Sequence, residues 1–295
     1  MIFQGAATAL ITPFSDGRVD TKALARLVNL QIAANIAALV VCGTTGEPCT
    51  MTEDERARVL DTVLRTADGR VPVIAGTGTN CTATTVEASR AAERAGADAL
   101  LLVTPYYNKC TQKGLLAHYS AVAAAVRLPI VVYNVPARTG VNILPETYAA
   151  LAHVPNIAAV KEASGNLPHI GEVAKAIAGR LTLYSGDDGL THDILRLGGQ
   201  GIISVASNVL PRCVSRVCAL YFEGKLNEAA ALHAQLQAVY RALFIEVNPI
   251  PVKAAAAHLG LCADELRLPL TEIEPGNRAV LTPLLEQAIE LEKTL

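Results

Sequence analysis

The stretch NIAAVKEASG (residues 156–165) places a lysine, Lys161, inside a short apolar run that is followed by turn-forming residues. Short apolar runs of this kind are typical of strands that are buried on both faces, as in parallel sheets. An amine in such a strand loses its hydration, and its burial costs free energy that a valine would not cost. The stretch therefore predicts a buried parallel strand and makes Lys161 a candidate for chemistry.

Seven further runs of the same kind flank this one. They are GAATALIT (5–12), ALVVCG (38–43), PVIAGTG (72–78), ALLLVTP (99–105), PIVVYNVP (129–136), LTLYSGDD (181–188) and GIISVASN (201–208). The starts of the eight runs are 20 to 34 residues apart, which allows one strand, one crossover helix and two loops in each repeat. This spacing predicts an α/β fold, a (β/α)8 barrel (TIM barrel). An open doubly wound sheet is the alternative, but GTGTN (76–80) lacks the third glycine of its phosphate-binding turn.

Helical patterns fill the intervals between the runs. Thr52 with Glu55, and Thr84 with Glu87, match the capping box at a helix start. After residue 208 the strand pattern stops and only helical patterns follow. We therefore predict a barrel over residues 1–224, which carries the active site, and a C-terminal helical extension over residues 225–295.

The composition excludes several classes of function. Hydrophobic residues make up 51% of the chain, charged residues 18%, and the net charge is −2, so nothing favours binding to nucleic acid or to an anionic membrane. The seven cysteines include no C-x-x-C pair, and the six histidines no H-x-x-x-H pair, which argues against disulfides and zinc. With no leader segment and no run of membrane-spanning length, we expect a soluble, cytoplasmic protein without a metal.

In a barrel of this class the reacting groups lie at the carboxyl ends of the strands. Strand alternation places Lys161 on one face of its strand, and Tyr133 has the matching position on the preceding strand. A desolvated lysine has a lowered pKa and can form a Schiff base with a carbonyl compound. Two plainer interpretations remain open: Lys161 extends to solvent, or it pairs with Glu162.

The other strand ends supply polar groups. Thr44 and Thr45 in GTTGE (43–47) can bind a carboxylate through hydroxyl and backbone donors, and Arg138 can bind a second carboxylate. Each of these features also has a structural interpretation, as an ordinary turn or a solvated arginine. For Asp187 and Asp188 we prefer the structural one, as caps of the next helix.

Eight motifs taken together resemble the dihydrodipicolinate synthase family of the class I pyruvate-lyase superfamily. In chain order they are GTTGE, PVIAGTG, VTPYYN, YNVPARTG, VKEASGN, SGDD, GIISV and NPIPVK, and ELRLPL (265–270) extends the likeness. The resemblance implies a lyase of lysine and diaminopimelate biosynthesis that condenses pyruvate with L-aspartate-4-semialdehyde and uses no cofactor. It also implies a homotetramer built from two tight dimers.

The resemblance further implies a role for each matching residue. Lys161 forms the imine with pyruvate, Tyr133 is the acid–base residue, and Thr44 and Tyr107 complete a proton relay, with Tyr107 entering from the neighbouring subunit. The substrate-binding set is Thr45 for the pyruvate carboxylate, Arg138 for the carboxylate of the semialdehyde, and Gly186 and the backbone of Ile203 as the pocket lining.

Two alternatives remain. One, an N-acetylneuraminate lyase or a 2-keto-3-deoxy-sugar-acid aldolase of the same superfamily, shares Lys161 and Tyr133. The other, a catalytically silent barrel, predicts the loss of at least one of Lys161, Tyr133 and Thr44, and all three are present. Arg138 and the doubled Thr44-Thr45 favour the synthase, because a sugar polyol requires hydroxyl-binding groups rather than a carboxylate clamp.

Regulation is the point at which the sequence departs from part of the family. Lysine-inhibited members carry a carboxylate where Thr84 stands and a histidine where Arg56 stands, whereas Asn80 and Tyr106 remain as a possible remnant of the regulatory site. Burying the ammonium of an inhibitor without an anionic partner is costly. We therefore expect weak or absent inhibition by L-lysine.

Overall fold

The computed structural model describes all 295 residues, Met1–Leu295. Eight strands form a closed barrel in the order β1-β10-β9-β8-β7-β6-β5-β4. They are β1 (Gly5–Ala9), β4 (Ala38–Val41), β5 (Val73–Gly76), β6 (Ala99–Val103), β7 (Ile130–Asn134), β8 (Ile157–Glu162), β9 (Thr182–Ser185) and β10 (Gly201–Ser204). Each strand lies within one of the eight apolar runs, which confirms the predicted (β/α)8 barrel.

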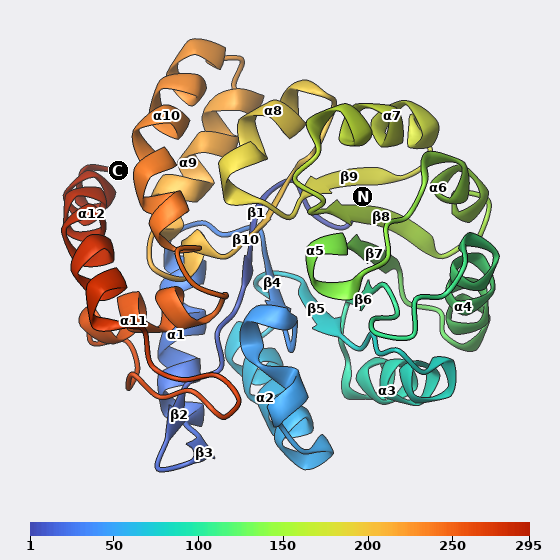
Figure 1. The fold of residues 1–295 in the computed structure, drawn as a ribbon, viewed down its shortest axis with the longest axis horizontal. Coiled ribbons are helices and arrows are strands. Elements are labelled where there is room, and N and C mark those ends of the chain that lie inside the picture. The colour runs from blue at the N-terminus through green and yellow to red at the C-terminus, as the bar shows by residue number, and fades with distance from the viewer. The chain divides into compact units, whose positions relative to one another are not determined.

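The chain divides into two compact units, and the first comprises Met1–Gln4 and Pro72–Ile203. It holds strands β5 to β9 and most of β10, with helices α3, α4, α6 and α7 following one another along the outer side of these strands (Figure 1). Its helices are α3 (Thr82–Ala95), α4 (Gln112–Ala125), α5 (Pro136–Thr139), α6 (Pro145–Leu151), α7 (Leu167–Ile177) and α8 (Thr191–Arg196).

The second unit comprises Gly5–Val71 and Ser204–Leu295. Helix α1 packs on α2, and α10 packs against both α9 and α12 (Figure 1). The helices of this unit are α1 (Thr21–Ala33), α2 (Glu53–Ala67), α9 (Pro211–Phe222), α10 (Leu226–Ala242), α11 (Ile250–His258) and α12 (Pro275–Thr294). The predicted helices of the C-terminal segment are therefore present, while the domain boundary at residue 224 stays a prediction.

Two local features differ from the expectation. A small antiparallel hairpin, β2 (Phe14–Ser15) with β3 (Arg18–Val19), is too short to produce a sequence pattern. The capping box at Thr52 is confirmed at the start of α2, whereas the second one was wrong. Helix α3 begins at Thr82 with Cys81 as its N-cap, so Thr84 lies inside the first turn.

None of the helices combines the length and the apolarity that crossing a membrane requires. All seven cysteines are free thiols.

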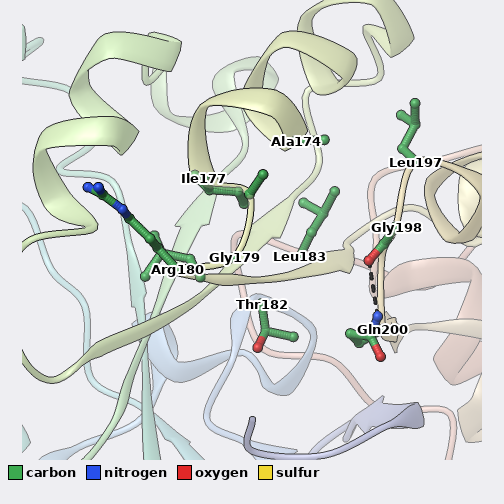
Figure 2. Close-up of a pocket in the computed structure, with 11 residues that line it drawn as sticks. Ala174, Ile177, Gly179, Arg180, Thr182, Leu183, Leu197, Gly198 and Gln200 are labelled. Carbon is green, nitrogen blue, oxygen red and sulfur yellow. Dashed lines mark hydrogen bonds between the residues drawn. The ribbon is translucent and has the colours of Figure 1, made fainter.

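A pocket of about 410 Å³ lies in the first unit, at the amino-terminal ends of β9 and β10 (Figure 2). Ile177 and Leu183 contribute apolar surface to it, and Thr182 and Gln200 contribute polar groups. Lys161 is the fifth of the six residues of β8 and therefore lies toward the opposite, carboxyl end of the strands. The pocket is thus separate from the candidate active site.

Candidate active site

Strands β7 and β8 bring Lys161 and Tyr133 together. The two strands pair in parallel, with Tyr133 opposite Lys161 and Asn134 opposite Glu162. The ammonium nitrogen of Lys161 lies 4.2 Å from the centre of the Tyr133 ring, and both side chains are buried. The predicted juxtaposition of Lys161 and Tyr133 is therefore present.

The environment of Lys161 favours its neutral form. Burial lowers the pKa of Lys161 from 10.5 to about 7; the negative charge of Asp188 opposes this shift and the positive charge of Arg138 reinforces it. A substantial fraction of the side chain is consequently an unprotonated amine near neutral pH. A neutral amine can attack a carbonyl carbon, whereas an ammonium cannot.

Glu162 is occupied by other partners and does not form the ion pair with Lys161 that a plainer interpretation allowed. Its carboxylate is fully buried and accepts hydrogen bonds from Asn134 Nδ2 (3.1 Å to each oxygen), from Tyr148 Oη (3.0 Å) and from the backbone N–H of Ser164 (2.9 Å). Strand alternation separates the two neighbours onto opposite faces of β8. Lys161 therefore extends into the candidate site, and the carboxylate of its neighbour Glu162 is bonded to other groups.

Gly186 provides the space beside Lys161. A Cβ atom at position 186 would lie 2.9 Å from Cε of Lys161 and 2.7 Å from Cβ of Ala163. Contacts under 3.0 Å are repulsive, so a larger residue would displace the lysine side chain. The backbone N–H of Gly186 donates to the carbonyl of Glu162 at 2.8 Å, which fixes the position of the glycine.

The two aspartates after β9 have different roles. Asp187 caps the following turn by accepting from the backbone N–H of Gly189 at 2.9 Å, as expected. Asp188 is only 1% exposed, and its charge acts on Lys161. The sequence interpretation of Asp188 as a simple cap therefore missed its electrostatic effect, and no local pattern distinguished it from its neighbour.

The remaining predicted residues of the first unit lie in the loops after β6 and β7 and in β10. Arg138 is exposed on the short helix α5, and the next residue, Thr139, is buried. Tyr107 is 89% exposed, has a positive φ of 74°, and its N–H points to the carbonyl of Thr139 at 3.4 Å. Ile203 is fully buried in β10.

The candidate regulatory residues Asn80 and Tyr106 are half-buried in the same unit. The carbonyl of Asn80 accepts from Asn108 Nδ2 at 2.9 Å. Thr84 is exposed on α3. The roles of all three in regulation stay predictions.

Thr44 and Thr45 belong to the second unit, in a short 3₁₀ turn, Thr44–Gly46, that follows β4. Thr45 is 3% exposed and Thr44 is half-buried. Thr12 Oγ1 donates to the carbonyl of Gly46 at 2.7 Å. A Cβ atom on Gly46 would lie 3.1 Å from the carbonyl oxygen of Leu10, so the glycine allows this close packing. The relay from Thr44 to Tyr133 stays a prediction.

No group of three or more His, Cys, Asp or Glu side chains is arranged to hold a metal ion. Strands β7 and β8 bring together an amine and a phenol, and the guanidinium of Arg138 on α5 acts electrostatically on the amine. This set can form an imine, transfer protons and bind an anion.

Known proteins match this chain over nearly its whole length. The profile of the dihydrodipicolinate synthetase family matches residues 2–288. A 4-hydroxy-tetrahydrodipicolinate synthase of Pelobacter propionicus is 47% identical over 97% of this chain and 98% of its own. The crystal structure of dihydrodipicolinate synthase from Thermotoga maritima superimposes with a TM-score of 0.96 at 42% identity, covering 98% of this chain and 99% of that one.

A second solved structure contains a bound small molecule. It is the chloride-inhibited dihydrodipicolinate synthase from Acinetobacter baumannii complexed with pyruvate, with a TM-score of 0.95, 42% identity and coverage of 98% and 99% of the two chains. The family profile and the near-complete coverage at more than 40% identity lead to one conclusion: the chain belongs to the dihydrodipicolinate synthetase family.

Proposed function

We propose that the chain is a 4-hydroxy-tetrahydrodipicolinate synthase, a lyase that condenses pyruvate with L-aspartate-4-semialdehyde through an imine on Lys161. The observation that carries the proposal is a buried lysine whose pKa lies at about 7, next to the buried Tyr133 ring. Membership in the family and the names of its relatives support the same reaction.

The proposed reaction begins with covalent capture of pyruvate. The neutral amine of Lys161 attacks the keto carbon, and loss of water leaves a protonated imine. The cationic nitrogen withdraws electrons, so the methyl group loses a proton and becomes the nucleophilic carbon of an enamine. Tyr133, which lies against Lys161, is placed to transfer these protons.

The enamine then attacks the aldehyde carbon of the second substrate, whose oxygen takes up a proton. The amine of the semialdehyde subsequently attacks the imine carbon, closes the ring and releases Lys161. In this scheme Thr45 holds the carboxylate of pyruvate and Arg138 that of the semialdehyde. The exposed position of Arg138 on α5 supports its contact with an entering substrate.

The proposed assembly is a homotetramer made of two dimers, located in the cytoplasm. Tyr107 supports the dimer, because a side chain that is 89% exposed on a backbone with a positive φ of 74° is available to a neighbouring subunit. In the dimer its hydroxyl would join Thr44 and Tyr133 in the relay. Mixing inactive Lys161→Ala and Tyr107→Phe proteins should restore activity if the tyrosine acts across the interface.

Trapping with borohydride tests the function directly. Reduction in the presence of pyruvate should fix an adduct on Lys161, located by mass mapping of peptides, and Lys161→Ala should lose activity by several orders of magnitude. An adduct on another lysine would refute the assignment.

A substrate panel separates the proposed function from the aldolase alternative. The protein should consume pyruvate with aspartate semialdehyde and should not cleave N-acetylneuraminate or 2-keto-3-deoxy sugar acids. Arg138→Ala should leave pyruvate trapping nearly intact but lower kcat/KM for the semialdehyde, because a lost contact to a charged group costs about 1.5–3 kcal/mol. An unchanged kcat/KM for the semialdehyde would favour the aldolase.

A further inference from the structure

Two motifs of the C-terminal segment have no part in the chemistry described so far. They are NPIPVK (248–253) and ELRLPL (265–270), and both lie in the second unit together with the GTTGE turn. Two side chains of the first motif and a backbone N–H of the second bond to this turn across more than 200 residues of sequence. These contacts bear on Thr45, the proposed ligand of the pyruvate carboxylate.

Asn248 is bonded directly to the Thr45 hydroxyl. Its Nδ2 donates to Oγ1 of Thr45 at 2.9 Å, and the two side chains are 5% and 3% exposed. A hydroxyl has a single proton to donate. Because the oxygen of Thr45 accepts from an amide, its own proton is directed away from Asn248 and is available to another acceptor.

Glu47, the last residue of the GTTGE turn, is held by a buried ion pair with Lys253. Glu47 has a positive φ of 54°, and its Oε1 accepts from Nζ of Lys253 at 2.7 Å, with the side chains 1% and 0% exposed. Its Oε2 accepts from the backbone N–H of Arg267 at 3.2 Å. A buried ion pair contributes little net stability, but it restricts its partners to one geometry.

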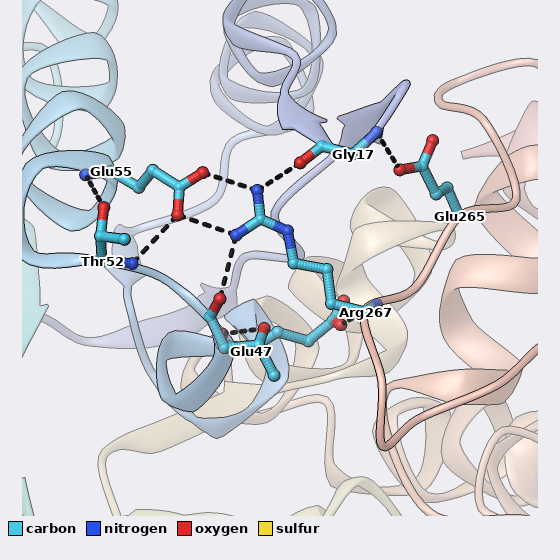
Figure 3. Close-up of polar contacts among 7 residues, drawn as sticks. Gly17, Glu47, Thr52, Glu55, Glu265 and Arg267 are labelled. Atoms are coloured by element: carbon cyan, nitrogen blue, oxygen red, sulfur yellow. Dashed lines mark hydrogen bonds and ion pairs between the residues drawn. The ribbon is translucent and has the colours of Figure 1, made fainter.

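Arg267 fixes the other side of the same region (Figure 3). Its guanidinium donates to both carboxylate oxygens of Glu55, at 2.6 and 2.8 Å, and to the carbonyls of Gly17 and Thr50. Thr50 in turn donates through Oγ1 to the carbonyl of Glu47 at 3.1 Å. The segment that follows Thr45 is therefore bonded on several sides.

We propose that Asn248 is a positioning residue that sets the Thr45 hydroxyl as a hydrogen-bond donor to the substrate carboxylate, while the Glu47–Lys253 pair holds the turn. The inference rests on the proposed function, since it takes pyruvate as the substrate at Thr45. It assigns to the C-terminal segment a part in selecting a 2-keto acid over a neutral ketone. The asparagine suits this task because it can donate to the hydroxyl without adding a negative charge beside the substrate.

The experiment compares two substitutions that keep the number and the branching of the side-chain heavy atoms of asparagine. In Asn248→Asp the new carboxylate only accepts, so the hydroxyl of Thr45 turns toward it and a negative charge is added. In Asn248→Leu the hydroxyl loses its partner but gains no acceptor. We expect the pyruvate concentration that half-saturates borohydride trapping to rise about tenfold or more for Asn248→Asp and less for Asn248→Leu, with kcat changed little.

A neutral substrate analogue supplies the control for structural damage. Pyruvamide keeps the keto group of pyruvate but lacks its carboxylate. Its half-saturating concentration for trapping should stay within about twofold of wild type in Asn248→Asp, where that for pyruvate rises about tenfold. A substitution that merely loosened the fold would affect both compounds equally.

A double-mutant cycle completes the test. Thr45→Val removes the hydroxyl, so adding Asn248→Leu to it should have little further effect on pyruvate trapping. Additive effects of the two substitutions, or unchanged discrimination between pyruvate and pyruvamide in both Asn248 variants, would overturn the inference. If Asn248→Asp does not fold, Asn248→Leu and the cycle decide alone. Failure of the wild-type protein to trap pyruvate on Lys161 would instead refute the proposed function.

Discussion

The proposed reactivity of a single side chain, Lys161, depends on its position in β8. Two neighbouring charges of opposite sign, Asp188 and Arg138, act on an amine that burial has already made less basic. The same burial that favours the neutral nucleophile also costs folding free energy, because water solvates the ammonium in the unfolded chain. Reactivity and stability are therefore opposed at this residue.

The pH dependence of imine formation should report the pKa of Lys161. The initial rate of borohydride-trappable adduct formation should rise with pH and level off above about 7, since only the neutral amine attacks. Arg138→Ala should move the midpoint to higher pH, because the lost positive charge disfavoured protonation. Asp188→Asn should move it to lower pH. Asp187→Asn is the matched control, and midpoints that move in the same direction for Arg138→Ala and Asp188→Asn would contradict this account.

Two buried lysines should respond oppositely to the same substitution. The pKa of Lys161 is lowered in the folded protein, so the unfolded state binds more protons between pH 7 and 10.5 and the cost of burial is largest below that range. Lys161→Met should raise the free energy of unfolding, on the order of a few kcal/mol at pH 6.5 and less at pH 9.5. Urea denaturation at the two pH values measures this difference.

Lys253→Met serves as the comparison. It leaves the carboxylate of Glu47 buried without its cation and should lower the free energy of unfolding by about 3–5 kcal/mol at pH 6.5. Destabilisation by Lys161→Met at pH 6.5 would show that its burial carries no such penalty.

At the scale of elements, the alternation of side chains along β7 and β8 places the candidate site residues on one face and the residues bonded beneath them on the other. In β7 and β8 one pair, Tyr133 and Lys161, lies at the site, and the next pair, Asn134 and Glu162, is bonded on the other face. In the second unit Arg267 connects the loop after α11 to α2 and to the turn between β2 and β3. Short-range sequence patterns predicted the strands. The contacts of Arg267 join residues more than 200 positions apart, so no local pattern could predict them.

The Arg267–Glu55 contact predicts an acid-dependent contribution to stability. Hydrogen bonding from Arg267 lowers the pKa of Glu55 from 4.5 to about 2. The contribution should be fully present above pH 4.5 and lost as the pH falls toward 2. Arg267→Gln should lower the urea midpoint at pH 6, and its difference from wild type should shrink toward pH 2.

An exposed pair on the same helix provides the control. Arg65 and Asp61 are 79% and 53% exposed, so Arg65→Gln should leave the urea midpoint almost unchanged. A difference between wild type and Arg267→Gln that grows on acidification would contradict the linkage.

At the scale of the whole molecule, the sequence determines the class of fold more clearly than its interior contacts. The eight strands were predictable because strands buried on both faces leave continuous apolar runs, as in PIVVYNVP. The hairpin β2–β3 was missed because two-residue strands leave no periodicity. The burial of Asp188 is set by the tertiary structure and leaves no local sequence pattern. The hydrogen bond from Asn248 to Thr45 joins residues 203 positions apart, so it leaves no such pattern either.

Inhibition by L-lysine belongs to this scale, because it would act on the activity of the whole enzyme. With both substrates subsaturating, 1 mM L-lysine should inhibit the initial rate by less than half, which corresponds to a binding free energy weaker than about 4 kcal/mol. The double substitution Thr84→Glu with Arg56→His should increase the sensitivity by supplying the missing anion and histidine. Half-inhibition of wild type below about 1 mM would show that another anion, such as Glu53, replaces Thr84.

The absence of a side chain at Gly186 couples the residue allowed at position 186 to the presence of lysine at position 161. A Cβ atom there would lie 2.9 Å from Cε of Lys161 and 2.7 Å from Cβ of Ala163, so a side chain at position 186 would displace the lysine from its present position. A lineage that abandoned the covalent step would release both constraints at once, and position 186 would then be free to diversify. Covariation of residues 161 and 186 among distant homologues would therefore mark the point at which a branch of the barrel gave up imine chemistry.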